Sequence, residues 1–157
     1  MSKARIAAAA GAAAIAIAAP VVMLWEGLER DPYRDIVGVS TVCYGHTGNV
    51  QNRRYSVEEC KALLAKDLAK HEAGIRHCLP ANLPVEVRAA FVSVAYNIGT
   101  GAFCGSSMSR HAQAGNLPAA CASLSRWNKV CPNGKCREVR GLTRRRADER
   151  KLCESGL

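Results

Sequence analysis

Residues 25–48 read WEGLERDPYRDIVGVSTVCYGHTG, and this stretch carries the most informative pattern of the chain. Two of its carboxyl groups and one hydroxyl form the pattern: Glu26 is followed after eight residues by Asp35, and Asp35 after five by Thr41. The β-branched residues and glycines of 33–44 predict a small hairpin, with 45–49 as a turn. A helix that carries Glu26, followed by such a hairpin, would let the three side chains face one cleft.

Two carboxyl groups in unlike surroundings are what the hydrolysis of a glycosidic bond requires. One is protonated and delivers its proton to the leaving oxygen, while the other stays ionised. Glu26 follows a run of apolar side chains, which favours the neutral carboxyl, whereas Asp35 has the polar neighbours Arg34, Ser40 and Thr41. On spacing alone the pattern is weak: acidic residues nine positions apart are common, and a solvated surface would be the favoured interpretation.

An uncharged segment of 20 residues, 6–25, precedes Glu26 and follows Lys3 and Arg5. As a helix it would be roughly 30 Å long, enough to cross the hydrocarbon core of a membrane. It consists mostly of Ala and Gly, and its strongly apolar members are Ile6, Ile15, Ile17, Val21, Val22 and Leu24. These contribute only a few kcal/mol of insertion free energy, about 0.3 to 0.6 each, so we expect weak insertion with Lys3 and Arg5 on the cytoplasmic side.

Three fates of this segment remain open. The small-residue pattern Ala16-Ile17-Ala18 would suit cleavage as a signal peptide, but the apolar run continues to Trp25. A permanent anchor fits poorly with the Ala and Gly content. We favour an uncleaved anchor that inserts and later leaves the bilayer. A buried Ala-rich core helix is a fourth, simpler interpretation, and the basic residues in front and the cysteines behind favour export over it.

The cysteines agree with export to an oxidising compartment. All eight follow the apolar segment and can form up to four disulfides, whose pairing the sequence does not fix. The one local prediction joins Cys131 to Cys136, because Pro132-Asn133-Gly134 can turn the chain between them. A zinc site at these two cysteines is a weaker alternative, since no second Cys/His pair lies close by.

The net charge of +9 predicts an anionic partner, such as nucleic acid, phospholipid head groups or an acidic cell-wall polymer. The densest cluster, Arg144-Arg145-Arg146, is interpreted as a solvated helix face that provides general electrostatic attraction. No zinc finger, RNA-binding aromatic signature or helix-turn-helix accompanies it, which argues against nucleic acid.

Further elements can be placed from their end signals. We expect a short helix over 26–31, closed by Pro32, and a helix opened by the capping box Ser56–Glu59. A central helix should begin at Pro84 and end near Gly99. Two later helices are expected from Asn116 to Trp127, and from a Thr143 cap to about Cys153. These patterns predict a mainly helical α+β domain with a small sheet near its front.

The quoted stretch resembles the active-site signature of phage-type lysozymes, glycoside hydrolase family 24. The similarity continues through RAAFVSVAYNIGTGAF and GLTRRRADERKLC, so it extends from about Trp25 to Cys153. With an Ala/Gly-rich N-terminus, the chain is most similar to the signal-anchor-release endolysins of tailed phages and prophages. The resemblance implies a two-lobed lysozyme-like domain over 26–157, preceded by a weakly hydrophobic signal anchor over 1–25.

The resemblance also implies roles for individual residues. Glu26 would be the general acid, Asp35 would orient or activate the attacking water, and Thr41 would help to position it. Tyr96 and Asn97 match family positions that line the cleft between the lobes. His46 is expected to hold its turn rather than to act in catalysis, and the remaining histidines, which are His71, His77 and His111, are interpreted as surface residues.

Two departures from the family matter. Some relatives carry a cysteine within the anchor that activates the enzyme by disulfide exchange, and residues 6–25 contain none. Control by conformation or position is therefore expected. Four cysteines fall at positions where relatives often have other residues: Cys78, Cys104, Cys131 and Cys136. We expect them to form additional disulfides, which puts disulfide pairings taken from relatives in doubt.

The expected function is that of an endolysin that hydrolyses the β-1,4 bond between N-acetylmuramic acid and N-acetylglucosamine in peptidoglycan and lyses the host. It would be a monomer without cofactor or metal, held inactive on the inner membrane through residues 6–25 with its N-terminus in the cytoplasm, and then released into the periplasm. The stereochemical outcome stays open, since it depends on the separation of the two carboxyl groups. The alternative is an exported, basic, disulfide-rich binding module or lysozyme inhibitor without catalysis.

Overall fold

The computed structural model describes residues 2–157 and begins with the long helix α1, Lys3–Glu26. The Ser2 hydroxyl caps its first turn by accepting from the backbone N–H of Arg5. The helix runs through Pro20 and ends directly after Glu26, where Gly27 takes a φ of +71° that few side chains tolerate. It is long and apolar enough to cross a membrane. Glu26 therefore closes α1 rather than opening a new helix.

The prediction of a short helix over 26–31 is wrong. Residues Glu29–Arg34 form strand β1, which pairs antiparallel with β2, Ser40–Cys43. The apolar sequence carries α1 up to Glu26, and Pro32 is tolerated in β1 because the two-stranded sheet has a free edge. The hairpin itself is confirmed, with Tyr33 opposite Thr41.

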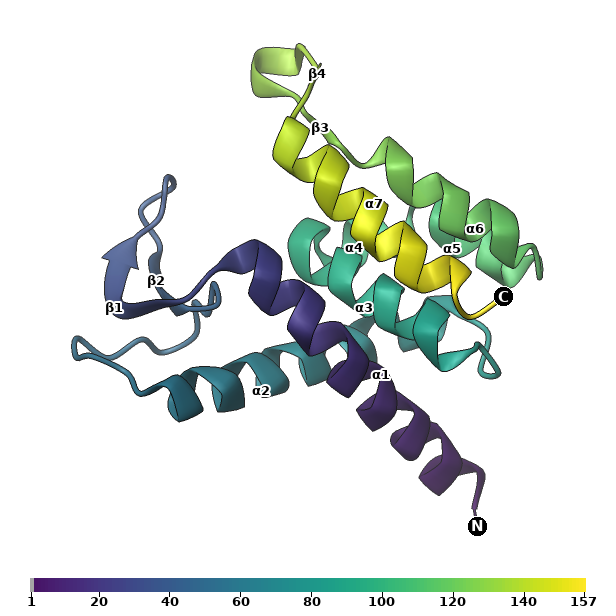
Figure 1. Cartoon of the computed structure of the whole chain (residues 1–157), viewed down its shortest axis with the longest axis horizontal. Helices are drawn as coiled ribbons and strands as arrows, with labels where there is room; N and C mark the ends of the chain where they lie inside the picture. The colour runs from purple at the N-terminus through teal and green to yellow at the C-terminus, as the bar shows by residue number, and fades with distance from the viewer. Residues whose placement is uncertain (1) are drawn as a thin grey trace.

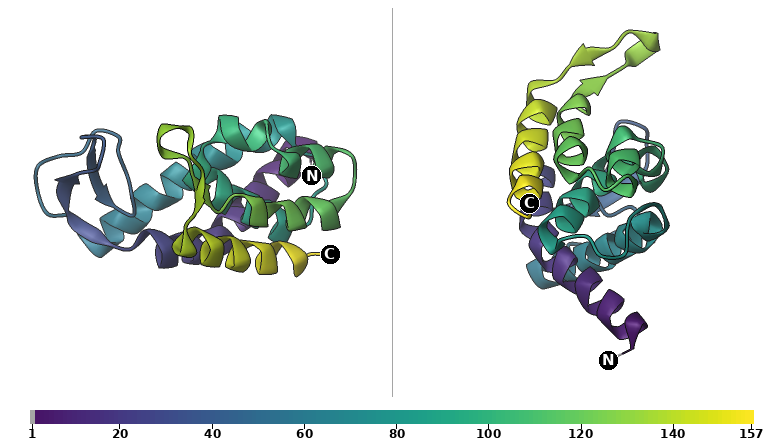
Figure 2. Two further views of the ribbon diagram at one scale, coloured as in Figure 1. Left: turned by 90° about the horizontal axis from the view of Figure 1, so that it is seen from above. Right: turned by 90° about the vertical axis from the view of Figure 1, so that its right-hand side faces the viewer.

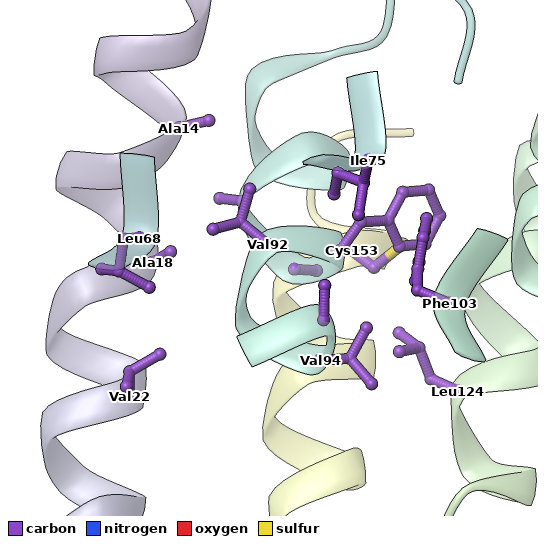
Figure 3. Packing of buried hydrophobic residues seen from close by; sticks show 14 of the residues in the cluster. Ala14, Ala18, Val22, Leu68, Ile75, Val92, Val94, Phe103, Leu124 and Cys153 are labelled. Atoms are coloured by element: carbon purple, nitrogen blue, oxygen red, sulfur yellow. The ribbon is translucent and has the colours of Figure 1, made fainter. Parts of the chain in front are cut away.

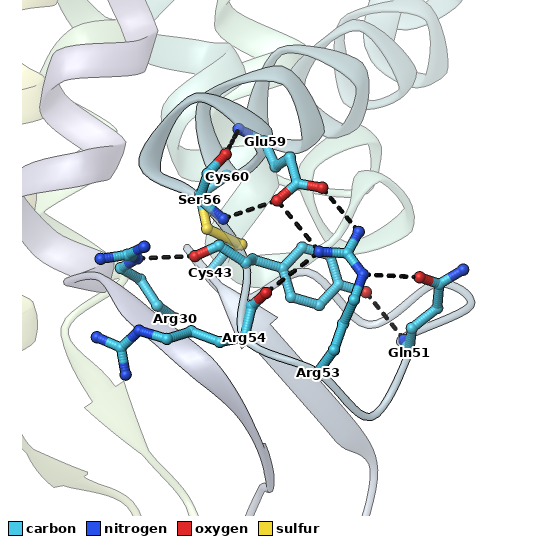
Figure 4. Close-up of polar contacts among 9 residues, drawn as sticks. Arg30, Cys43, Gln51, Arg53, Arg54, Ser56, Glu59 and Cys60 are labelled. Carbon is cyan, nitrogen blue, oxygen red and sulfur yellow. Dashed lines mark hydrogen bonds and ion pairs between the residues drawn. A yellow bond between two sulfur atoms is a disulfide. The ribbon is translucent and has the colours of Figure 1, made fainter.

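Helix α2, Val57–Ile75, begins at the predicted capping box. The Ser56 hydroxyl accepts from the Glu59 N–H, and the Glu59 carboxylate accepts from the Ser56 N–H. The same carboxylate pairs with Arg53, whose guanidinium lies over the ring of Tyr55 (Figure 4). A disulfide from Cys43 to Cys60 ties the hairpin to the first turn of α2.

The second half of the chain is a set of helices with one small hairpin. After a short 3-10 turn, η1 at Arg76–Cys78, the helices are α3 (Val85–Ile98), α4 (Thr100–Cys104), α5 (Ser107–Gln113), α6 (Leu117–Ser123) and α7 (Arg140–Glu154). The start of α3 at Pro84 and its end at Gly99 are confirmed. The start of α6 at Asn116 is also confirmed, although its last turn becomes a 3-10 segment, η2, Leu124–Arg126.

The predicted start of the last helix is wrong. Helix α7 begins at Arg140, and the Thr143 hydroxyl lies inside it and donates to the carbonyl of Val139. The helix starts earlier because a hairpin delivers the chain to it. That hairpin consists of β3 (Lys129–Val130) and β4 (Arg137–Glu138), joined by a turn with the 3-10 segment η3 at Pro132–Gly134.

The core lies around α3, which is buried along most of its length. The small residues of α1 pack on it. Ala14, Ala18 and Val22 are buried and face the core (Figure 3). Gly11 is buried as well, beside Glu72 of α2. The opposite face of α1 is exposed, so the apolar segment uses its small side chains for close helix packing. Removing these apolar surfaces from water stabilises the docked helix.

Four disulfides close the structure and leave no free cysteine among the described residues. They join Cys43 to Cys60, Cys78 to Cys104, Cys121 to Cys153 and Cys131 to Cys136. The local prediction for Cys131 and Cys136 is confirmed. The four cysteines singled out as additional pair with one another, which excludes the zinc interpretation of Cys131 and Cys136.

The molecule has two lobes, as predicted. The β1–β2 hairpin and the start of α2 form the smaller lobe, and α3 to α7 form the larger one (Figure 1). Helices α1 and α2 belong to both, because each runs from the small lobe into the large one (Figure 2). Glu26 stands at the end of α1 where the lobes meet.

Candidate active site

A cavity of about 460 Å³ opens between the lobes, beside the end of α1. Its walls come from α1, the segment after β2, α2 and the end of α3. The lining residues are Glu26, Gly45, His46, Thr47, Gly48, Asp67, Lys70, His71, Tyr96 and Asn97. Of the predicted site residues, Glu26, Tyr96 and Asn97 therefore meet in one cavity.

Glu26 is held by an ion pair. Its Oε1 accepts from Nη1 of Arg145 at 2.6 Å, although the two residues are 119 positions apart. The apolar surround expected for this carboxyl is therefore wrong, because the large lobe supplies a buried cation that the local sequence does not reveal. The other oxygen, Oε2, lies beside Gly45, since a Cβ atom built on Gly45 would be 3.7 Å from it. One oxygen is thus held by Arg145, and Glu26 lines the cavity.

Arg145 belongs to a buried charge network on α7. Glu149 is fully buried and pairs with Arg145 at 3.2 Å and with Arg146 at 3.0 Å, and the Ser93 hydroxyl donates to it at 2.7 Å. Burial raises the pKa of Glu149, against which the charge of Arg146 and the hydrogen bond from Ser93 act. The network spans α3 and α7 and fixes the guanidinium that holds Glu26.

This arrangement corrects the interpretation of Arg144-Arg145-Arg146 as a solvated face. Only Arg144 is exposed, whereas Arg145 and Arg146 are 4 % and 1 % exposed. A signal was present in the sequence: Arg145, Glu149 and Cys153 recur every four residues, on one helix face with a cysteine. That face had to be buried, and the arginines with it.

Tyr96 and Asn97 close the end of α3 over the cavity. The Tyr96 hydroxyl donates to the carbonyl oxygen of Tyr44 at 2.6 Å, which links the two lobes. Burial, together with the nearby charges of Asp67 and Glu26, raises the pKa of Tyr96 well above its ordinary value, so it remains a neutral donor. The Asn97 side-chain oxygen accepts a hydrogen bond from Nη2 of Arg146 at 2.7 Å, which fixes the orientation of the Asn97 amide group.

Asp35 and Thr41 lie on the hairpin, and neither lines the cavity among the residues described. Asp35 Oδ1 accepts from the backbone N–H of Val37 at 3.0 Å and of Val39 at 2.9 Å, which closes the β1–β2 turn. The hydroxyl of Thr41, which is buried, donates to the Val39 carbonyl at 3.0 Å. Asp35 Oδ2 has no protein donor within residues 2–157, so this oxygen is available to water.

Two histidines line the cavity, one as predicted and one not. His46 pairs through Nδ1 with Asp67 at 2.7 Å and through Nε2 with the carbonyl of Gly48, contacts that hold its turn. His71 was interpreted as a surface residue, which is wrong. Its Nδ1 contacts the carbonyl oxygen of Asp67 at 2.7 Å, and its ring packs on Tyr96 with centroids 5.1 Å apart. The contact is with a backbone carbonyl, which any residue four positions earlier would offer, so the sequence carried no signal for it.

One group of metal-ligand side chains comes together elsewhere in the described part of the chain: His77, Cys78 and Cys104. Both sulfur atoms are consumed by the Cys78–Cys104 disulfide, so they cannot act as thiolate ligands. This cluster is therefore interpreted as structural.

Solved structures define the class of protein. The muramidase domain of SpmX from Asticaccaulis excentricus matches with a TM-score of 0.82 at 28% identity, over 87% of this chain and 93% of that one. The active form of the P1 phage endolysin Lyz matches with a TM-score of 0.77 at 27% identity, over 89% of this chain and 84% of that one. The fold and its interlobe cavity are those of a lysozyme.

The family follows from the sequence. The phage lysozyme family matches residues 23–149. The SAR-endolysin of Enterobacteria phage P21 is 40% identical over 156 residues, which cover 94% of this chain and 92% of that protein. The chain belongs to the phage lysozyme family, and the resemblance inferred from residues 25–48 is confirmed.

A second solved form of the P1 endolysin bears on the state of the N-terminal helix. The secreted inactive form of Lyz matches with a TM-score of 0.51 at 25% identity, over 69% of this chain and 75% of that one. The active form matches better in both score and coverage. The overall structure of this chain is thus more similar to the active form.

Proposed function

We propose that this lysozyme cleaves peptidoglycan with Glu26 as its general acid. The observation that carries the proposal is the position of Glu26 in the interlobe cavity, with Oε1 held by Arg145 and Oε2 beside Gly45. A carboxyl fixed through one oxygen can present the other to a glycosidic oxygen with little reorganisation. The scissile bond is the β-1,4 link between N-acetylmuramic acid and N-acetylglucosamine.

Asp35 and Thr41 supply the water. The fixed Oδ1 of Asp35 holds the carboxylate in the hairpin turn, while Oδ2 orients a water molecule for attack. Thr41 anchors the same turn from the other strand through Val39 and positions that water together with Asp35. Tyr96 and Asn97 line the cavity and contact the glycan.

The N-terminal segment holds the enzyme first at the inner membrane and then releases it into the periplasm. Residues 1–25 act as a signal anchor, with Lys3 and Arg5 in the cytoplasm, and residues 26–157 form the muramidase domain. In the tethered form Glu26 is held at the head groups, away from Arg145. Release into the periplasm lets α1 pack on α3, and this packing places Glu26 in the cavity of a monomeric enzyme. The similarity to the active form of the P1 endolysin supports this order of events.

Turbidity loss of outer-membrane-permeabilised Gram-negative cells tests the proposal. Glu26→Gln should abolish lysis by the purified protein, because an amide cannot donate the required proton. Glu29→Gln, an exposed carboxyl three residues later, is the matched control and should retain activity. Wild-type-like lysis by a folded Glu26→Gln protein would refute the role of Glu26. A wild-type protein that binds cell walls without lysing cells would point instead to a binding module or inhibitor.

A further inference from the structure

The hairpin over residues 129–138, here called the arm, has no role in the site described so far. Every one of its ten residues is exposed, and β3 and β4 pair only with each other. It projects from the end of the large lobe that is nearer the β1–β2 hairpin, as Figure 1 and the left view of Figure 2 show. The arm buries no core, so the stability of the fold does not explain it.

The arm is nevertheless built to be rigid. The Cys131–Cys136 disulfide closes its tip. Its base is braced by Asn128, which is buried: the Asn128 carbonyl accepts from the Val139 N–H at 2.9 Å, and its amide donates to the Thr143 hydroxyl at 3.1 Å. A disulfide that stabilises no core still removes conformational freedom, and an element fixed in advance loses less entropy when it binds a partner.

The arm and its flanks are strongly basic. Glu138 is the one acidic residue in 126–144, whereas six basic side chains are exposed there: Arg126, Lys129, Lys135, Arg137, Arg140 and Arg144. None of these six makes an ion pair or side-chain hydrogen bond within residues 2–157. Elsewhere in the same part of the chain, exposed arginines such as Arg53, Arg54 and Arg150 do have carboxylate partners. The positive charge of the arm is thus left for an external anion.

Its position relates the arm to the cavity. Arg140, at the base of the arm, precedes Arg145, which holds Glu26, by five residues, roughly 8 Å along α7. A second hollow of about 470 Å³ lies at this base, lined by Glu138, Arg140, Thr143 and Arg144.

We propose that the arm is a binding surface for the carboxylates of peptidoglycan stem peptides, which holds the strand beside the cavity. This inference rests on the proposed function, because it takes peptidoglycan as the substrate. A bilayer is the other anionic surface in the same setting, and the arm fits it less well. Val130, at 38 % exposure, is its only exposed large apolar side chain, and membrane-surface elements need an apolar face to bury.

The test is a pelleting assay with purified sacculi in a Glu26→Gln background, so that binding is measured without hydrolysis. Neutralising Lys129, Lys135 and Arg137 to Gln should weaken binding about tenfold, since three exposed charge contacts are lost. The matched control neutralises three exposed cations on other faces, Lys61, Arg110 and Lys151, and should change binding less than twofold. Both triple variants should melt like the parent.

Two further binding measurements identify the ligand and the role of the disulfide. Sacculi whose carboxyl groups have been amidated should bind parent and arm variant equally. The pair Cys131→Ser/Cys136→Ser should weaken binding to intact sacculi while the charges remain. Equal loss in the arm and control variants would reduce the effect to general attraction and overturn the proposal. So would arm-dependent binding to phosphatidylglycerol vesicles without arm-dependent binding to sacculi.

The outcome is separable from the proposed function. If the wild-type enzyme fails to clear sacculi, the muramidase assignment fails, whereas the binding assay still reports on the arm. In the active enzyme, the arm variant should raise the half-saturating concentration of sacculi and leave the maximal rate unchanged, because the arm touches no reacting atom.

Discussion

At the scale of single residues, the site depends on one carboxylate held from the opposite end of the chain. Arg145 reaches Glu26 because Glu149 and Ser93 hold it in a fully buried network. Leaving a buried charge without its partner typically costs about 3–5 kcal/mol of folding free energy. Removing one member of such a network therefore destabilises the protein by more than the intact network stabilises it. The position of Glu26 is therefore a property of the packed large lobe as much as of α1.

The dual role of Asp35 can be divided by substitution. Asp35→Asn keeps a side-chain oxygen to accept from Val37 and Val39 but loses the negative charge. We expect activity to fall about 100-fold or more, in the range for loss of a general base, with the hairpin intact. Lytic assays and the backbone amide shifts of Val37 and Val39 would measure both properties.

Asp35→Ala is the comparison for that prediction. It removes the acceptor as well as the charge, so it should also destabilise the hairpin turn by about 1–2 kcal/mol. Wild-type lysis by Asp35→Asn would show that the carboxylate serves only the turn, and water activation would then need another group.

At the scale of elements, α1 docks against a buried charge rather than a purely apolar groove. A Cβ atom on Gly11 would lie 3.2 Å from Cδ and Oε2 of Glu72. Glu72 is 2 % exposed and is held by Arg88 at 3.3 Å and by Arg76. Because the carboxylate is held from two sides, any side chain larger than that of glycine would press on it at this contact. Glu72 was not anticipated as a buried member of the α2 face.

Gly11→Leu should therefore misplace α1 and, with it, Glu26. We expect the purified soluble protein to lose most of its lytic activity and about 3 kcal/mol of unfolding free energy, the cost of overpacking a filled site. Ala13→Leu adds the same side chain to an exposed position of the same helix and should leave both quantities near the parent. Urea unfolding and turbidity assays of the two proteins give the comparison; equal behaviour would argue against a steric role for Gly11.

The start of α2 should be sensitive to acid. The hydrogen bond from Arg53, followed by that from the Ser56 backbone, lowers the pKa of Glu59 to about 2. A depressed carboxyl pKa stabilises the folded state above the unfolded value of about 4.3, and this contribution is lost as pH falls toward 2. Titration of the Glu59 carboxyl carbon by NMR should place its midpoint near 2.

Arg53→Gln supplies the control for the acid titration, because it removes the first cause and keeps the capping box. The Glu59 midpoint should then rise toward its ordinary value. A wild-type midpoint already near 4 would mean that the ion pair in Figure 4 does not persist in solution.

At the scale of the whole molecule, the proposed release from the membrane requires the same helix to suit two environments. A span rich in Ala and Gly inserts weakly, and the small side chains that weaken insertion are those that let α1 approach α3 closely. Ala14, Ala18 and Val22 are buried in the docked state, whereas Ala9, Ala13 and Ala16 are exposed. Membrane affinity and docking can therefore be altered separately.

Changing Ala9, Ala13 and Ala16 to Leu should trap the enzyme in the membrane, by on the order of 2 kcal/mol of added insertion free energy, without obstructing the docking face. Fractionation before and after collapse of the proton-motive force measures the effect. The wild-type chain should move to the soluble fraction at full length, and the triple variant should not. A wild-type chain that stays in the membrane, or leaves it only after shortening near Ala18, would rule out release of the intact anchor.

Local signals in the sequence determined a large part of the fold. The Ser56–Glu59 capping box, Pro84 before α3, the β-branched hairpin and the turn between Cys131 and Cys136 act over a few residues, so the sequence alone could predict them. The same holds for the family signature of residues 25–48. The assignment of 26–31 to a helix failed because Gly27 stops α1 there and strand pairing takes over.

Only the tertiary structure decided which side of each helix is buried and which distant residues meet. Arg145 is buried although its local sequence is typical of a solvated face, because α7 turns it toward Glu26. The two residues are 119 positions apart, so the local sequence does not reveal that contact. The pairings of Cys43, Cys78 and Cys121 likewise join positions 17 to 32 residues apart. Local propensity fixes where an element begins and ends, whereas burial of its faces depends on partners that only chain packing brings together.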